Sequence, residues 1–347
     1  MCERSWLQRV VQQSLKRIQS ANTAQSDERW DELLEQAATI LSRLDDDQRE
    51  TIYILPTTTS TSVHARTTTP QTVKIRNHTL LSSQTGHRTW GSAPALSRRM
   101  CLNPQQFFPH SALPSSQLRV LELGSGTGLV GIAALAILDS LERNALVTLS
   151  DGGDSLDAVS TDGVIGNLRH NLDTYLGGRD PDRKGIDAEI KQFRWDDYLA
   201  LPTNGEDPNS HRPKRIRTEQ PYDVILATDC VYEPQHAESL HAAVSAHLRF
   251  PSSSTSLSSP AFHLILPLRR THASESAAVD RMFPPALSER LPGQLPPQSA
   301  RAAERTWRLV ATEREHFRAP DGFADNHGRD HRIIEYRRYK IEWEEIA

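Results

Sequence analysis

The sequence predicts an α/β fold, a doubly wound and mainly parallel sheet of seven strands, preceded by an N-terminal helical extension and a hairpin. Three observations support this prediction. Short apolar runs alternate with helical patterns from Leu118 onward, and a glycine-rich turn, 124–128, directly follows the first run. Two late runs, 306–313 and 331–339, follow one another with no helical pattern between them. Such alternation is typical of βαβ units with parallel strands, and the late pair would close the sheet as an antiparallel hairpin.

The individual elements follow from apolar runs bounded by turn residues and from apolar spacing of three to four residues. The predicted parallel strands are 118–123, 145–150, 188–193, 222–228 and 262–267. The predicted helices between them are 128–140, 155–175 and 235–248.

The region before this alternation has a different pattern. Apolar residues recur at helical spacing in 5–19 and 27–44, which predicts two amphipathic helices. Thr72–Ile75 and Thr79–Leu81 flank an Asn-His pair, which predicts a short hairpin. We therefore expect an accessory region at 1–70 and the main domain at 71–347.

Three stretches of the main domain have the composition of surface insertions: 201–220, which contains the basic run PKRIR, the Ser-rich 251–260 and the Pro-rich 284–299. Compositions of this kind are typical of flexible loops. Short basic runs also occur in nuclear import signals, so the expected location is the cytoplasm, with the nucleus as the alternative.

Charge and cysteine content argue against several protein classes. The formal net charge is −4, so the chain lacks the basic field that supports general nucleic-acid binding, and nucleic acid is not an expected direct partner. The three cysteines lie far apart without zinc-type spacing, so we expect no metal site. The longest strongly apolar run, 129–138, is shorter than the ~20 residues that a membrane span needs. We expect no membrane partner, and a monomer.

The strongest functional signal is RVLELGSGTG, residues 119–128, a strand followed by a glycine loop and an apolar helix. Glycines at Gly124, Gly126 and Gly128 remove side chains where the backbone must approach a ligand. The start of the following helix offers free N–H groups. Glu122, near the end of the strand, suits a ligand with a cationic methionine end. The ExGxGxG pattern therefore predicts binding of S-adenosylmethionine.

The same loop also fits a dinucleotide-binding pattern. Gly126, Gly128 and Gly131 satisfy GxGxxG. In that register the strand should run directly into Gly126, whereas the apolar strand ends at Leu123. Glu122 would also repel a pyrophosphate. A dehydrogenase is therefore the weaker interpretation.

The next strands end in residues suited to a nucleoside. The second strand ends at Asp151, where a carboxylate can accept hydrogen bonds from both ribose hydroxyls. The third leads to Trp195, which is placed to cover an adenine face, and Asp196, which is placed to address the adenine edge. In isolation, Asp151 is also an ordinary turn residue and Trp195 an ordinary core residue.

The fourth strand is a near-continuous apolar run that ends in Thr228 and Asp229, followed by Cys-Val-Tyr232. This pattern is typical of a central parallel strand whose carboxyl end opens on the ligand crevice. We expect Asp229 to lie close to the donor methyl group and the acceptor. We expect His236 to lie on a helix surface rather than to act as a base.

Taken together, these motifs resemble a known family. ELGSGTGLVGIAAL, the Trp195 strand end and ATDCVY resemble the Asp-x-x-Tyr group of seven-strand, class I protein lysine methyltransferases. Upstream, the TGHRTW segment that ends at Trp90 resembles the TG-x-RTW segment of the eukaryotic elongation factor 2 lysine methyltransferases, and VTLSDGGDS and the Asn167…Asn171 pair are similar to the same subgroup. The resemblance covers about 70–270. Gly91 and Pro94 depart from it, because bulkier residues are expected there.

By position, the resemblance implies cofactor contacts from Trp90, Gly124, Asp151, Trp195 and Thr228. It implies that Asp229 and Tyr232 form the Asp-x-x-Tyr element at the acceptor, as the catalytic residues.

The expected function is thus transfer of a methyl group from S-adenosylmethionine to a lysine of a protein such as elongation factor 2. Two alternatives stay open at this point. One is a methyltransferase of RNA or a small molecule, although an Asn-Pro-Pro-Tyr-type motif for base amino groups does not follow strand four. The other is a non-catalytic, cofactor-binding assembly partner.

Overall fold

The structure is a computed structural model that describes residues 49–62, 65–77, 85–108, 117–152, 163–180, 185–199, 220–251, 259–268, 273–287, 306–320 and 333–346. The helices expected at 5–19 and 27–44 lie outside these residues. So does most of each expected insertion.

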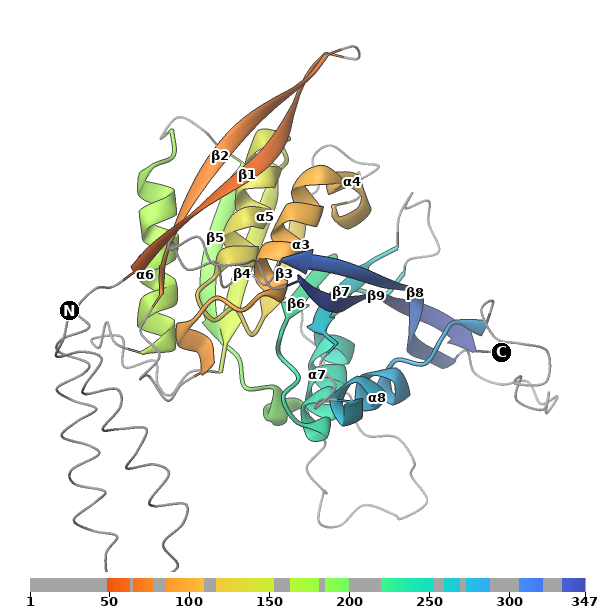
Figure 1. The fold of residues 1–347 in the computed structure, drawn as a ribbon. Helices are drawn as coiled ribbons and strands as arrows, with labels where there is room; N and C mark the ends of the chain where they lie inside the picture. Colours follow the sequence, from red (N-terminus) through yellow and green to blue (C-terminus); the bar gives the residue numbers. More distant parts are fainter. Residues whose placement is uncertain are drawn as a thin grey trace, which may run out of the picture.

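One seven-stranded sheet organises the described residues, in the order β5-β4-β3-β6-β7-β9-β8 (Figure 1). Its strands are β3 (Leu118–Leu123), β4 (Ala145–Asp151), β5 (Ile186–Gln192), β6 (Val224–Thr228), β7 (Ala261–Pro267), β8 (Thr306–Pro320) and β9 (Ile333–Ile346). The strands from β5 to β7 pair in parallel, and β9 pairs antiparallel with β7 and β8. The predicted fold class, including the closing hairpin, is confirmed.

The order of the strands reverses between β3 and β6. From β3 the chain proceeds outward to β4 and β5, then returns to β6 on the other side of β3. In open α/β sheets, ligands bind at such a reversal, outside the carboxyl ends of the strands. The topology therefore places the glycine loop after β3 and the Asp229 segment after β6 beside one another.

Helices cover both faces of the sheet, and each face has its own apolar core. One core includes residues of α3 (Ser92–Leu102), α4 (Pro104–Phe107), α5 (Leu129–Ser140) and α6 (Val164–Gly177). The other includes residues of α7 (Pro234–His247) and α8 (Ala273–Met282). Sequence patterns predicted α5 and α7 to within a residue or so, placed the start of α6 at 155 rather than Val164, and missed α3, α4 and α8.

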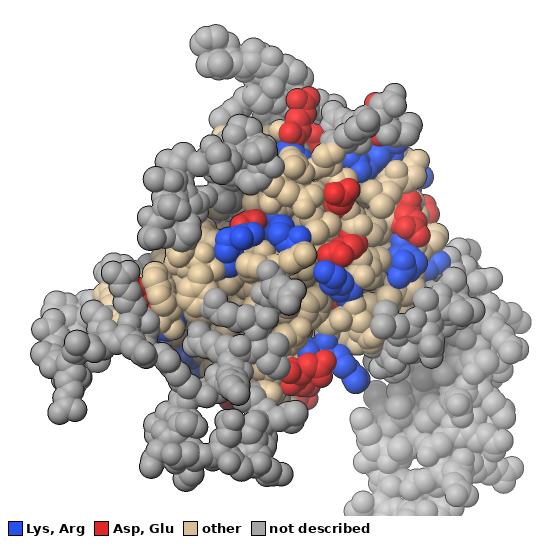
Figure 2. Space-filling view, turned by 180° about the vertical axis from the view of Figure 1, so that it is seen from behind, with Lys and Arg blue, Asp and Glu red and all other residues tan. Residues whose placement is uncertain are grey.

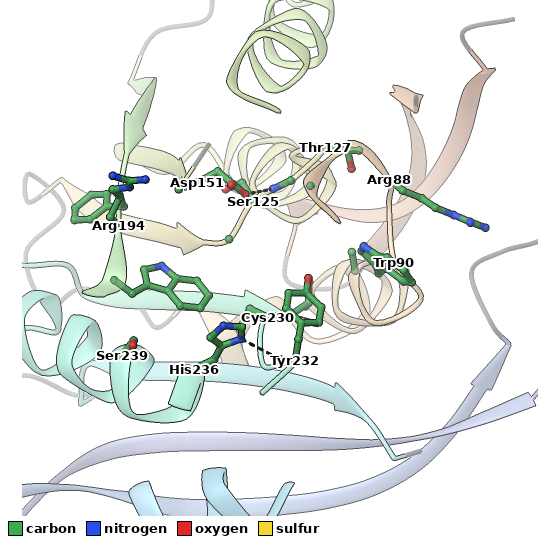
Figure 3. A pocket seen from close by; sticks show the side chains of 18 of the residues that line it. Arg88, Trp90, Ser125, Thr127, Asp151, Arg194, Cys230, Tyr232, His236 and Ser239 are labelled. Carbon is green, nitrogen blue, oxygen red and sulfur yellow. Dashed lines mark hydrogen bonds between the residues drawn. The ribbon is translucent and has the colours of Figure 1, made fainter. Parts of the chain in front are cut away.

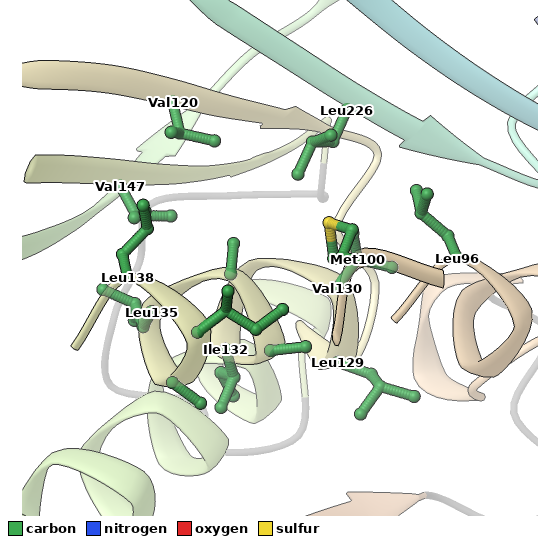
Figure 4. Packing of buried hydrophobic residues seen from close by; sticks show 14 of the residues in the cluster. Leu96, Met100, Val120, Leu129, Val130, Ile132, Leu135, Leu138, Val147 and Leu226 are labelled. Atoms are coloured by element: carbon green, nitrogen blue, oxygen red, sulfur yellow. The ribbon is translucent and has the colours of Figure 1, made fainter. Parts of the chain in front are cut away.

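Helix α5 is buried on nearly every side, which explains its all-round apolar sequence. Figure 4 shows its side chains, such as Ile132, between the strand residues Val120 and Val147 and the α3 residues Leu96 and Met100. The helix also contacts an N-terminal hairpin on its other side. The apolar run that was too short for a membrane span is therefore a core helix. Within the described residues, no helix has the length and apolarity needed to cross a bilayer.

The hairpin consists of β1 (Arg49–Ser62) and β2 (Ala65–Asn77), which pair antiparallel and pack over α3, α5 and α6. The short hairpin expected between 72–75 and 79–81 is wrong, because 72–75 belong to β2 and pair with residues 51–54 of β1. Thr79–Leu81 lie outside the described residues. Pro70 lies within β2, so the domain boundary expected at 70 falls inside a paired strand.

Candidate active site

A cavity of about 330 Å³ opens at the carboxyl ends of the central strands, where the strand order reverses (Figure 3). Four groups of residues line it: the segment 86–90, the glycine loop 124–127, the strand ends at 151–152 and 193–196, and residues that follow β6. Of the predicted site residues, Trp90, Gly124, Gly126, Asp151, Trp195, Thr228 and Tyr232 line the cavity. Glu122, Gly128 and Asp229 are not among its lining residues.

The glycine loop needs its glycines for conformation and for space. Gly124, Gly126 and Gly128 have φ angles of 69°, 51° and 85°, in the left-handed region that side chains disfavour. A Cβ on Gly124 would lie 3.2 Å from the Trp195 ring, and one on Gly126 would lie 3.1 Å from the Gly86 carbonyl oxygen. Gly128 occupies the N-cap position of α5 and faces Leu168. It therefore determines the turn into the helix and does not face the cavity.

Asp151 joins the end of β4 to the glycine loop. Its Oδ2 accepts a hydrogen bond of 2.8 Å from the Gly126 N–H (Figure 3). The residue also lines the cavity, where a ribose acceptor was expected. Asp151 therefore sets the position of the loop in addition to presenting a carboxylate to the cavity.

Glu122 does not line the cavity and instead binds the helix that follows the glycine loop. Its Oε2 accepts a hydrogen bond of 2.9 Å from the Gly131 N–H in α5, and the side chain is buried. Burial, with a smaller contribution from the nearby Asp151 charge, raises the pKa of Glu122 to about 8, although hydrogen bonds with Ser125 and Gly131 lower it in part. Because side chains alternate between the two faces of a strand, Glu122 points to the face of the sheet that α5 covers. The strand ends one residue later, at Leu123. This raised pKa favours the protonated carboxyl in the unliganded protein.

The end of β5 is anchored to α7. The 3-10 turn η2 (Trp195–Tyr198) contains Trp195, whose ring lies next to Gly124, and Asp196, whose Oδ1 accepts a 2.6 Å hydrogen bond from Ser239 Oγ. Ser239 is buried and lines the cavity, and sequence analysis missed it. The bond holds the predicted adenine-binding turn against the helix that follows the acceptor segment.

Trp90 lies in an irregular segment that crosses the cavity. Next to it, the Thr89 N–H donates a 2.9 Å hydrogen bond to Asn77 Oδ1 at the end of β2. The hydroxyls of Thr89 and Thr127 lie 2.7 Å apart and share a hydrogen bond. The segment is therefore tied both to the hairpin and to the glycine loop.

A buried polar network extends this connection to α6. Asn171 Oδ1 accepts a 2.8 Å hydrogen bond from the Arg76 N–H, and its Nδ2 donates 2.9 Å to the Thr127 carbonyl. Asn167 Oδ1 accepts 2.8 Å from Arg76 Nε. The Asn pair that the sequence resemblance singled out thus joins β2, α6 and the glycine loop. Sequence patterns gave no signal for Arg76 or Asn77 as members of the site.

The side chains at the end of β6 and just after it point in different directions. Thr228 and Cys230 line the cavity, whereas the Asp229 carboxylate accepts a 2.8 Å hydrogen bond from the Ser92 N–H at the start of α3. Tyr232 is exposed at the cavity mouth, near Trp90 (Figure 3). The Tyr232 N–H donates a hydrogen bond of 3.3 Å to His236 Nδ1.

His236 is half-buried in the first turn of α7 and lines the cavity. A helix that starts at Pro234, just beyond the strand end, points its first turn back towards the cavity. Because Nδ1 accepts a hydrogen bond, the neutral ring carries its proton on Nε2 and presents a donor there. Among the residues that the structure describes, no cluster of three or more His, Cys, Asp or Glu is arranged to hold a metal ion.

Comparisons with known proteins agree with this geometry. Residues 68–171, which include Trp90, the glycine loop and the Asn pair, match a family model described as lysine methyltransferase. The chain is 28% identical over 209 residues to the "Protein N-terminal and lysine N-methyltransferase EFM7" of Cryptococcus neoformans var. neoformans serotype D (strain B-3501A), covering 59% of this chain and 58% of that protein.

Two further relatives have the same general description. The chain is 26% identical to the "Protein-lysine N-methyltransferase rrg1" of Schizosaccharomyces pombe, over 64% of this chain and 59% of that protein. It is 28% identical to the "Protein-lysine N-methyltransferase EFM2" of Saccharomyces cerevisiae, over 58% of this chain and 42% of that protein. The chain thus spans less than two thirds of the length of these curated relatives.

The matching segment contains the glycine loop, the residues that tie it to the hairpin, and the Trp90 segment above the cavity. Over residues 68–171 the chain is therefore similar to lysine methyltransferases.

Proposed function

We propose that this chain transfers a methyl group from S-adenosylmethionine to a lysine side chain of a protein, and that elongation factor 2 is its substrate. The observation that carries the proposal is the cavity itself. Its lining combines the Asp151-bound glycine loop and Trp195 with Trp90 and the exposed Tyr232. A nucleoside-binding part and an exposed, aromatic part are what a cofactor and a long, flexible acceptor side chain require.

The residues present fit the cofactor. Asp151 is placed for the ribose hydroxyls, Trp195 for the adenine face, and the glycine loop for close backbone approach. Gly124, Gly126, Thr228 and Trp90 would complete the contacts. When bound, the cofactor supplies a methyl group that its sulfonium charge has already activated.

The protein's part is then to align and desolvate the acceptor amine. Tyr232 and Trp90 present aromatic surfaces at the mouth, where an ammonium group is attracted to ring faces. The amine must be neutral to react, and removal of water around it favours the neutral form because desolvation lowers the pKa of a lysine. We place Tyr232 at the acceptor.

The substrate proposal rests on the sequence. TGHRTW, which ends at Trp90, resembles the segment of elongation factor 2 lysine methyltransferases and forms the cavity edge next to the mouth. A second candidate acceptor is the α-amine of a protein N-terminus, because the printed name of the Cryptococcus relative includes it. Both acceptors are amines that must be neutral to react, but the lysine amine ends an unbranched chain whereas the α-amine is attached to a Cα.

The test is methylation of purified elongation factor 2 by the purified chain, with the modified residue located by mass spectrometry. A new methyl group on a lysine is expected, and Gly126→Arg serves as the inactive control. Methylation confined to an N-terminal amine would favour the second candidate. Turnover with RNA or a small molecule and none with any protein would refute the proposal. Cofactor binding without turnover on any of these would favour the assembly partner.

A further inference from the structure

The segment Thr85–Ser92, here the roof segment, forms one wall of the cavity. Gly86, Arg88, Thr89 and Trp90 all line it. The segment contains one short 3-10 turn, η1 (Thr85–His87), and is otherwise irregular until α3 begins at Ser92. Its position therefore depends strongly on side chains that bind its backbone.

Two such bonds lie on either side of Trp90. On one side, Asn77 Oδ1 accepts the hydrogen bond from the Thr89 N–H. On the other, Asp229 Oδ2 accepts the 2.8 Å hydrogen bond from the Ser92 N–H. Asp229 therefore fixes the end of the roof segment that leads into α3.

Helix α3 depends on this carboxylate for a cap. Gly91 occupies its N-cap position and makes no side-chain capping bond. Asp229 supplies one from 137 residues further along the chain. A carboxylate at a helix N-terminus is stabilised both by the N–H groups and by the helix dipole.

The backbone of Asp229 has the conformation that this contact requires. Its φ is 52°, one of two positive values among the described non-glycine residues. Such a conformation is disfavoured for most side chains and tolerated by Asp and Asn. Thr228 and Cys230 line the cavity on either side of it, whereas the Asp229 side chain is buried against the start of α3.

We infer that Asp229 is a positioning residue: its carboxylate holds the start of α3, and through it Trp90, in place over the cofactor cavity. In this role it does not orient the acceptor amine, as its place in the sequence suggested. The inference rests on the proposed function only in that it takes this cavity to be the cofactor site.

Two substitutions separate the two roles. Asp229→Gly removes the carboxylate and keeps a residue that adopts positive φ without strain. Asp229→Asn keeps an acceptor oxygen for the Ser92 N–H and tolerates the same conformation, but removes the charge. Asp223→Ala is the matched control. Asp223 lies just before β6, and its Oδ2 accepts a 2.9 Å hydrogen bond from the Arg119 N–H at the opposite end of the strand from the cavity.

The main measurement is the Kd of S-adenosylhomocysteine by calorimetry. We expect Asp229→Gly to weaken binding about tenfold, Asp229→Asn to recover most of that loss, and Asp223→Ala to stay within about twofold of the wild type. In a Trp90→Ala background, Asp229→Gly should weaken binding by less than about twofold, because the ring that it positions is gone.

A different pattern would overturn the inference. If Asp229→Gly binds the ligand as tightly as the wild type does, and both Asp229 variants lose methyl transfer about a hundredfold in single-turnover assays, the charge acts at the acceptor. Equal losses of affinity in the wild-type and Trp90→Ala backgrounds would also refute it. Should Asp229→Gly not fold, the Asn variant decides, since a hundredfold loss of methyl transfer with an unchanged Kd would show that the charge acts at the acceptor. If the wild-type chain does not bind the ligand at all, it is the cofactor assignment that fails.

Discussion

At the scale of single residues, Gly126 is a constrained position of the cofactor loop, packed against backbone. Its φ of 51° and the Gly86 oxygen, which would lie 3.1 Å from an added Cβ, leave little room for any side chain. We expect Gly126→Ala to weaken binding of S-adenosylmethionine about tenfold, because an alanine in the left-handed region costs about 1–2 kcal/mol and the roof segment must shift. Titration calorimetry measures this directly.

Gly177 provides the control for Gly126. It is the last residue of α6, and nothing lies within 4 Å of an added Cβ. Gly177→Ala should leave cofactor affinity unchanged and raise stability slightly, since alanine is the better helix former. If Gly126→Ala binds the cofactor as Gly177→Ala does, the loop is not the binding element.

Glu122 gives the protein a specific dependence of stability on pH. The folded protein holds the Glu122 proton up to a pKa of about 8, whereas the unfolded chain releases it near 4.5. The unfolded state therefore binds fewer protons between these values, and the free energy of unfolding falls as pH rises through this window. The contribution is fully present below pH 4.5 and is lost above pH 8.

Glu122→Gln should remove this dependence while keeping an acceptor oxygen for the Gly131 N–H. Between pH 6.5 and 9 we expect the unfolding free energy of the unliganded wild type to fall relative to the variant by up to about 1.4 kcal/mol per pH unit. Urea titrations across this range measure it. Burial lowers the pKa of His247 to about 4 and of His263 to about 3, so their effects fall below this range, where stability declines as pH falls. Parallel curves for the two proteins would show that Glu122 is ionised in the folded state.

At the scale of elements, the sequence pattern predicted the strands and helices whose own residues form a continuous apolar run. The strands β3, β4 and β7 and the helix α5 are nearly continuous apolar runs with turn residues at their ends, and their limits were predicted to within a residue or so. Helix α3 was missed because its pattern is weak, with two arginines and a proline among its residues, and because its N-terminal cap comes from Asp229. A cap so distant in sequence leaves no local signal.

The hairpin shows the same limit. The Thr-rich stretch 57–69 has no marked apolar pattern, yet most of it forms the outer part of β1 and β2. Only the lower part of the hairpin has a buried apolar side, which includes Leu55, Val73 and Ile75. The pairing depends on contacts with α3, α5 and α6, which a sequence pattern does not reveal.

The Asn171 network predicts that the hairpin and the cofactor loop are coupled. Asn171 is buried and binds Arg76 on one side and the Thr127 carbonyl on the other. Asn171→Ala leaves buried backbone groups on both sides without these partners, which typically costs about 1–3 kcal/mol. We expect a loss of this size in the free energy of unfolding, and weaker cofactor binding because Thr127 belongs to the loop.

Thr174→Ala, on the same helix, is the matched control. The Thr174 hydroxyl donates an exposed hydrogen bond of 2.8 Å to the His170 carbonyl, one turn earlier in α6. Chemical denaturation and calorimetry of both variants test the coupling. If Asn171→Ala loses stability and keeps full cofactor affinity, the network serves the fold alone.

At the scale of the whole molecule, the described surface carries mixed charge and no single basic face in the view of Figure 2. On the face seen in Figure 2, basic and acidic side chains lie among one another over the described surface. Ion pairs such as Arg337 with Asp280 and Arg318 with Glu335 join the two signs. The net charge of −4 argues against a strong basic field. It gives no information about which acceptor the protein selects, because that choice depends on the shape of the cavity mouth.

The site was predicted in outline because strand ends of a doubly wound sheet converge at one edge. Asp151 and Thr228 end two strands, Trp195 follows a third, and all three line the cavity. The direction of each side chain was not predictable in the same way. Glu122 and Asp229 turn away from the cavity to bind helix N–H groups, because a helix start close to each offers them donors.

The cavity lies between the two apolar cores, and this placement leads to a prediction for the whole molecule. The roof segment and glycine loop adjoin the core under α3 and α5, whereas η2 and the first turn of α7 adjoin the other core.

A ligand that contacts both walls stabilises the folded state by about 2.7 kcal/mol at a concentration one hundred times its Kd. For a chain of 347 residues, we expect S-adenosylmethionine to raise the melting temperature by roughly 4 °C. NAD at the same concentration should leave it unchanged, and Gly126→Arg should abolish the shift caused by S-adenosylmethionine. Thermal scans with each ligand measure these shifts, and a rise with NAD alone would restore the dehydrogenase interpretation.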